Sequence, residues 1–199
     1  MFDAGMSDFL SKVVYFEKPG RSNTARTLKA AHERAEELGL RSVVVASTTG
    51  ETGLEAARVF KGFNVVVVSH VTGFAEPNVQ QLTEERRAEI IAQGGKVVTV
   101  THAFGGAGRA VRRKFGTVQA DELMANVLKL FGEGVKVAVE VALMAADAGL
   151  VRVDEEVVAI GGTGGGCDSA LILSPANVHN LFDLRVHEVI CKPRLTRRV

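Results

Sequence analysis

The chain has 199 residues, of which 46% are hydrophobic, and its 24 lysine and arginine residues nearly balance 23 aspartate and glutamate residues. This length and apolar content favour one domain, while the charge balance argues against partnership with nucleic acid or an anionic membrane. Its two cysteines, Cys167 and Cys191, lack metal-site spacing, so we expect no metal and a reducing, cytoplasmic location. The most apolar long stretch, residues 134–150, is too short and too charged to span a bilayer.

Apolar runs rich in valine alternate with segments whose apolar residues recur at helical spacing, a pattern typical of βαβ units. Continuous valine runs indicate strands buried on both faces, as in parallel sheets. We therefore predict a single domain over residues 1–199, an α/β/α sandwich with a mostly parallel sheet and at least one antiparallel strand near the C-terminus. The predicted strands are Lys12–Phe16, Ser42–Ala46, Asn64–Val68, Lys96–Val100 and Glu156–Ile160, followed by the closing strands Ala170–Leu173 and Glu188–Cys191.

Two helices are predicted in the second half, at Thr117–Phe131 and Val135–Ala148. The latter carries valine and alanine on several sides, so we expect it to pack deeply or against a partner subunit. A homo-oligomer is the expected assembly.

The polar segment Ser47–Gly53 follows a predicted strand and precedes a helical pattern that starts at Leu54. Thr52 and Glu55 have capping-box spacing, so Thr52 is the predicted N-cap. Free N–H groups at a helix start, together with glycines and hydroxyls, suit an anion. A helix-capping turn with nothing bound is the alternative. The expected phosphate contacts are Ser47, Thr48, Thr49, Gly50, Glu51, Thr52 and Gly53.

A second loop, Gly161–Gly166, has five glycines in six residues and follows another predicted strand. Glycines at this density indicate that the backbone lies close against something, either a ligand or, in a tight hairpin, another strand. The ligand interpretation assigns contacts to Gly161, Gly162, Thr163, Gly164 and Gly165.

Polar residues follow each predicted parallel strand, and the carboxyl ends of such strands share one edge of the sheet, where α/β proteins bind ligands. His70 and His102 hold equivalent positions after neighbouring strands, and Glu17 follows the first strand. These three are the candidates for a catalytic base, while ordinary loop histidines and a solvated glutamate are the alternative. Asn23 and Thr72 complete the candidate ligand contacts.

Taken in order, these segments resemble the C-terminal α/β domain of pyruvate kinase, and more closely the small stand-alone proteins built on that domain. In the kinases a Ser/Thr-x-Ser/Thr-Gly-x-Ser/Thr loop holds an effector phosphate, and Ser47, Thr49, Gly50 and Thr52 stand in those places. Gly162–Gly166 looks like the later loop that closes over the effector. The resemblance implies a core sheet of strand order 3-2-1-4-5 with one antiparallel strand.

The resemblance also implies what the chain binds. Some stand-alone relatives are similar to proteins seen with flavin mononucleotide (FMN), so FMN is the expected phosphorylated small molecule, with a flavin-dependent enzyme as one outcome. A regulatory or scaffold module that binds a sugar phosphate or nucleotide is the alternative, and a hydrolase or transferase using His70 or His102 is a third. Glu51 stands where the kinases commonly have a basic residue, which argues against a doubly phosphorylated sugar.

We expect no pyruvate kinase activity from this chain alone. In pyruvate kinase, phosphoryl transfer takes place in a (β/α)₈ barrel, which needs about 200 to 250 residues of its own.

Overall fold

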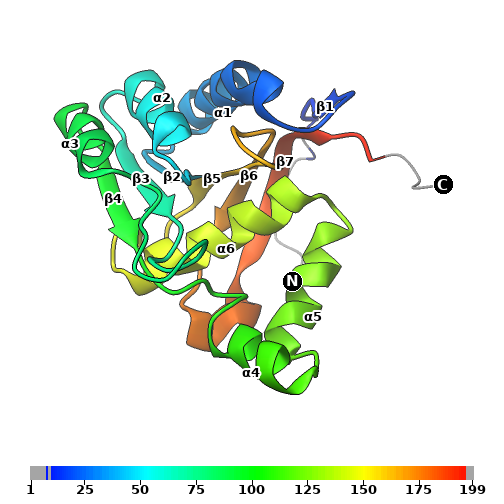
Figure 1. The fold of residues 1–199 in the computed structure, drawn as a ribbon. Helices are drawn as coiled ribbons and strands as arrows, with labels where there is room; N and C mark the ends of the chain where they lie inside the picture. The colour runs from blue at the N-terminus through cyan, green and yellow to red at the C-terminus, as the bar shows by residue number, and fades with distance from the viewer. Residues whose placement is uncertain (1–7, 9, 196–199) are drawn as a thin grey trace.

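The computed structural model describes residue 8 and residues 10–195 of the chain. A seven-stranded sheet lies between two layers of helices (Figure 1), which confirms the predicted α/β/α architecture. The strands are β1 (Val14–Phe16), β2 (Ser42–Ala46), β3 (Asn64–Ser69), β4 (Lys96–Thr99), β5 (Val157–Gly161), β6 (Ser169–Ser174) and β7 (Arg185–Pro193). The helices are α1 (Thr24–Leu38), α2 (Glu51–Val59), α3 (Glu84–Ala92), α4 (Ala107–Phe115), α5 (Ala120–Lys129) and α6 (Glu133–Asp147), with short 3₁₀ helices η1 (Arg21–Asn23) and η2 (Val178–Asp183).

The strands are arranged in the order β1-β7-β6-β5-β2-β3-β4. β2 pairs in parallel with β3 and β5, β3 pairs in parallel with β4, and β6 is antiparallel to β5 and β7. Counted from β2, the run β4-β3-β2-β5-β6 is the predicted 3-2-1-4-5 order with its antiparallel strand at the end. β7 and β1 extend the sheet past β6, so the first predicted strand lies at the far edge of the sheet, parallel to β7.

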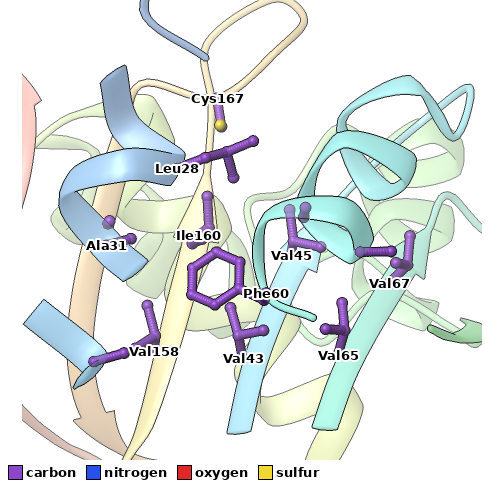
Figure 2. Close-up of a cluster of buried hydrophobic side chains, with 14 of the residues drawn as sticks. Leu28, Ala31, Val43, Val45, Phe60, Val65, Val67, Val158, Ile160 and Cys167 are labelled. Carbon is purple, nitrogen blue, oxygen red and sulfur yellow. The ribbon is translucent and has the colours of Figure 1, made fainter. Parts of the chain in front are cut away.

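Successive valines of the central strands enter opposite faces of the sheet, so the sheet has two cores. Val43 and Val45 of β2 point into the layer formed by α1, α2 and α3, where they meet Phe60 and Leu28 (Figure 2). Val44 points into the layer that contains α5 and α6. Because all of these side chains are fully buried, the continuous valine runs are explained by burial of the strands on both faces, as predicted.

Helix α6 crosses the second face of the sheet in contact with β5, β2 and β6, as Figure 1 shows. Gly161 at the end of β5 permits this close approach, because a Cβ there would lie 2.2 Å from the Gly134 carbonyl oxygen and 2.7 Å from the Ala138 nitrogen. Deep packing, one of the two placements predicted for this helix, therefore accounts for its valine and alanine content. Within the described ranges, the chain has no helix that combines the length and the apolar character needed to cross a bilayer.

Helices α4 and α5 pack against each other, and α5 packs against α6. A short turn joins the two helices. Gly116 ends α4 in the left-handed conformation, with φ of 73°. Gln119 and Glu122 then form a capping box, which starts α5 at Ala120, later than the predicted Thr117. Helix α5 thus runs from this turn back toward α6, against which it packs.

Candidate functional site

A pocket of about 790 Å³ opens at the carboxyl edge of β2 and β3, between the start of α2, the loop after β5 and one side of α6. We call it the edge pocket. Its volume lies in the range of small-molecule sites. Of the predicted ligand contacts it is lined by Ser47, Thr48, Thr49, Glu51, Thr52, Gly162, Thr163, Gly164 and Gly165, and of the predicted catalytic candidates by His70 and His102.

The loop after β2 presents its backbone to the edge pocket. Gly50 adopts the left-handed conformation, with φ of 90°, and α2 begins at Glu51. The Gly53 N–H donates to the Ser47 hydroxyl at 3.0 Å. The N–H groups of residues 48–52 have no acceptor within the described part of the chain. Those of Glu51 and Thr52 belong to the first turn of α2, whose N–H groups lack intrahelical partners.

The predicted N-cap is wrong. Gly50 occupies that position and has no side chain to cap α2, and the Ser47 hydroxyl instead accepts from the Gly53 N–H of the first turn. Thr52 lies inside the first turn, with its side chain largely buried against the edge pocket. The left-handed Gly50 starts the helix two residues earlier than the capping-box pattern indicates.

The glycine-rich loop connects the antiparallel neighbours β5 and β6, so it is a hairpin connection whose tip also lines the edge pocket. Gly164, Gly165 and Gly166 all have positive φ, a conformation that L side chains rarely adopt. A Cβ on Gly166 would lie 2.6 Å from the Arg21 Cα, so the loop packs closely against the segment before α1. The two interpretations of this loop, ligand contact and a tight hairpin, are therefore compatible.

Arg21 and Glu51 form an ion pair across the mouth of the edge pocket, joining η1 to the first turn of α2. Their side chains are 68% and 45% exposed. Solvent and salt screen a pair of this kind, so it adds little to stability and leaves Arg21 available to an anion.

Aromatic rings form one wall of the edge pocket. His70 and His102 follow β3 and β4, whose register aligns Ser69 with Thr99, and their ring centroids are 5.3 Å apart. Phe74 stacks on His102 at 5.1 Å and lies 4.1 Å from His70. The Arg109 guanidinium lies 5.1 Å from the Phe74 ring centroid, within cation–π range.

Behind this wall lies a buried charged cluster on α6. The Glu140 carboxylate accepts from the Phe104 N–H at 3.0 Å and from the Lys136 ammonium at 2.5 Å. The His102 Nδ1 lies 3.8 Å from Glu140, and its Nε2 accepts from the Val71 N–H at 3.4 Å. His102 is thus held as the neutral Nδ1–H tautomer.

Burial is the main cause that lowers the pKa of His102 to about 4 from 6.5, with the positive charges of Lys136 and Arg109 adding to the shift and Glu140 opposing it. A depressed histidine pKa means that the unfolded chain binds more protons than the folded chain between pH 6.5 and pH 4. The free energy of unfolding therefore falls as the pH falls through this window, by about 2 to 3 kcal/mol from His102 alone.

The measurement compares urea unfolding at pH 7.5 and pH 4.5 in the wild type and in His102→Gln, whose side chain does not titrate. The difference between the two proteins isolates His102 from the other groups that titrate. A ¹⁵N NMR titration checks the cause directly. An imidazole that protonates near pH 6.5 would contradict this account of the cluster.

Three polar sequence candidates lie outside the edge pocket. Asn23 donates from its amide to the Lys18 carbonyl at 2.8 Å and so fixes the turn before α1. Thr72 is exposed, and its hydroxyl accepts from the Gln80 amide at 3.3 Å. Glu17 is exposed just beyond β1 at the outer edge of the sheet.

Three glycine candidates and Cys167 also lie outside the lining of the edge pocket. Gly50 and Gly53 shape the loop without lining the pocket, since a Cβ on Gly53 would lie 2.5 Å from a Val67 methyl carbon. Gly161 is buried in β5 under α6. Burial raises the pKa of the Cys167 thiol, which disfavours the reactive thiolate form.

Several residues that line the edge pocket have no site role predicted from the sequence. Lys136 and Glu140 are the most informative, because they lie four residues apart on an otherwise apolar helix. Buried charges on such a helix have to pair or serve a site, so this spacing was a usable signal. Further examples are Arg21, Phe74, Glu133 and Met144.

A match to a protein-family model agrees with this architecture. The family model described as "Pyruvate kinase, alpha/beta domain" matches residues 25–173. Two crystal structures of pyruvate kinase from Cryptosporidium parvum are similar, at 15% and 16% identity with TM-scores of 0.39 and 0.41, and each match covers 80% of this chain. The matches span only 23% and 24% of those kinase chains. An O-ureido-L-serine synthase structure matches 48% of this chain and 30% of its own, at 26% identity and a TM-score of 0.30. On the strength of the family match, the chain belongs to the pyruvate kinase alpha/beta domain family.

Proposed function

We propose that the edge pocket binds a phosphorylated small molecule that carries a planar ring, with FMN as the candidate. The observation that carries the proposal is that the N–H groups of residues 48–52 have no acceptor within the described residues, while Thr48, Thr49, Glu51 and Thr52 of this segment line the pocket at the start of α2. Backbone amides at a helix N-terminus favour an anion. Arg21, at the mouth, adds a positive charge whose only ion-pair partner among the described residues is the half-exposed Glu51.

The rest of the edge pocket fits the remainder of such a ligand. Val137, Val141 and Met144 of α6 line it opposite residues 47–53, which we call the phosphate loop, and Phe74 belongs to its aromatic wall. Sites of this kind combine a broad apolar surface with few polar groups. FMN combines a phosphate, a hydroxylated chain and a flat ring system. The N–H groups of residues 48–52 fit the phosphate, and the apolar and aromatic residues fit the ring system. When bound, the flavin supplies redox chemistry, while the protein binds and orients it.

The test titrates the protein with FMN and with riboflavin, which lacks the phosphate, and follows flavin fluorescence. We expect FMN to bind more tightly than riboflavin. Thr52→Val, which removes the hydroxyl with little change in shape, should weaken FMN binding about tenfold and leave riboflavin binding unchanged. Thr72→Val is the matched control, because Thr72 lies outside the edge pocket.

Equal affinities for FMN and riboflavin would exclude the phosphate loop as the anchor. Thermal stabilisation by a sugar phosphate or nucleotide, with no binding of flavin, would select the alternative of a regulatory or scaffold module.

A further inference from the structure

A second cavity, of about 440 Å³, lies between α4, α5 and the start of α6. Five basic side chains and one acidic side chain line it, together with Phe104, Ala125 and Asn126. We call it the basic cleft. Its basic residues are Arg109, Arg112, Arg113, Lys129 and Lys136.

Three of these cations already have carboxylate partners. Arg112 contacts Glu122 at 2.7 Å, Lys129 contacts Glu133 at 3.3 Å, and Lys136 contacts Glu140 at 2.5 Å. The Arg112 hydrogen bond is the main cause that lowers the pKa of Glu122, and the charge of Arg109 adds to it. The single acidic side chain of the basic cleft is therefore fully engaged.

Arg109 and Arg113 have no carboxylate partner within residues 10–195. They lie four residues apart on α4, so their side chains share one face of the helix, where like charges repel. Helix α4 carries no acidic residue that could offset this repulsion. An anion in the basic cleft would offset it.

We propose that the basic cleft binds a phosphate or pyrophosphate group through Arg109 and Arg113. Guanidinium groups bind phosphate oxygens with paired N–H donors, and two cations that form no ion pair within residues 10–195 match an anion with two or more negative charges. Phe104 and Ala125 close the floor of the cleft, so the charges surround a concave site of small-molecule size. The chain as a whole has nearly balanced charge, which disfavours an extended nucleic-acid surface.

The proposal does not depend on the function proposed for the edge pocket, although the two cavities share Arg109 and Lys136. Arg113 lines the basic cleft and does not line the edge pocket. It is therefore the residue that separates the two sites in an experiment.

The test is calorimetric titration of the full chain with inorganic pyrophosphate at constant ionic strength. We expect Arg113→Ala to weaken pyrophosphate binding about tenfold. Lys114→Ala is the matched control, because it removes the neighbouring positive charge of α4 from a side chain that does not line the basic cleft. We expect it to change the affinity less than twofold. Thr52→Val, in the edge pocket, should leave this binding intact even if FMN binding is lost.

Three results would overturn the proposal. They are no pyrophosphate binding by the wild type, equal losses in Arg113→Ala and Lys114→Ala, and tighter binding of single-stranded RNA than of pyrophosphate. Circular dichroism establishes that each variant is folded before it is titrated.

Discussion

Replacing Gly161 with alanine is expected to lower the free energy of unfolding by about 3 kcal/mol. The new Cβ would lie 2.2 Å from the Gly134 carbonyl oxygen and 2.7 Å from the Ala138 nitrogen, and both atoms belong to the α6 backbone. Neither can rotate aside as a side-chain end can. The helix would have to move away from β5, which opens gaps throughout the second core.

Urea unfolding followed by circular dichroism measures this loss. Gly149→Ala, just beyond the C-terminus of α6, is the control, since Gly149 has φ of 69° and nothing within 4 Å of a Cβ. This variant introduces backbone strain without a steric clash, so it should lower the free energy of unfolding by about 1 kcal/mol. Similar losses in the two variants would show that contact between α6 and β5 is looser than the structure indicates.

The sheet and the position of the edge pocket were predictable because their causes are local. Valine runs such as Ser42–Ala46 predict buried parallel strands, and polar residues at their carboxyl ends therefore meet at one edge. His70 and His102 come together for this reason, through the aligned ends of β3 and β4. Their chemical role stays a prediction.

The remaining features depend on contacts between distant segments. Glu17 follows a genuine strand, but β1 pairs with β7 at the outer edge, a choice that no local pattern in Lys12–Phe16 encodes. The start of α2 depends on the left-handed Gly50, whose Cβ would lie 2.2 Å from the Arg86 side chain, so α3 constrains this turn from outside. Local capping rules cannot include such a neighbour.

The site role of Lys136 and Glu140 also depends on contacts between distant segments. Their spacing was visible in the sequence, yet their place beside His102 depends on how closely α6 approaches β5 at Gly161. A charged pair on an apolar helix signals a site without saying which one. Only the packing of the helix connects it to the histidine after β4.

Lys136→Met is expected to lower the free energy of unfolding by about 3 kcal/mol or more at pH 7.5. The side chains of Lys136 and Glu140 are 12% and 6% exposed, so the change would leave a buried carboxylate without its cation. The Phe104 N–H, 3.0 Å away, can offset only part of that cost. Lys136 also lowers the pKa of His102, so its removal should raise that pKa and favour an imidazolium beside Glu140.

Urea unfolding of the single variants and of Lys136→Met/Glu140→Gln measures the coupling between the two residues. The double variant buries no charge and keeps an acceptor for the Phe104 N–H, so it should regain most of the stability lost in Lys136→Met. A ¹⁵N NMR titration of His102 in Lys136→Met then separates charge from packing. If the double variant is as unstable as Lys136→Met, the loss comes from the packing of the lysine stem, and an unchanged His102 pKa would lead to the same conclusion.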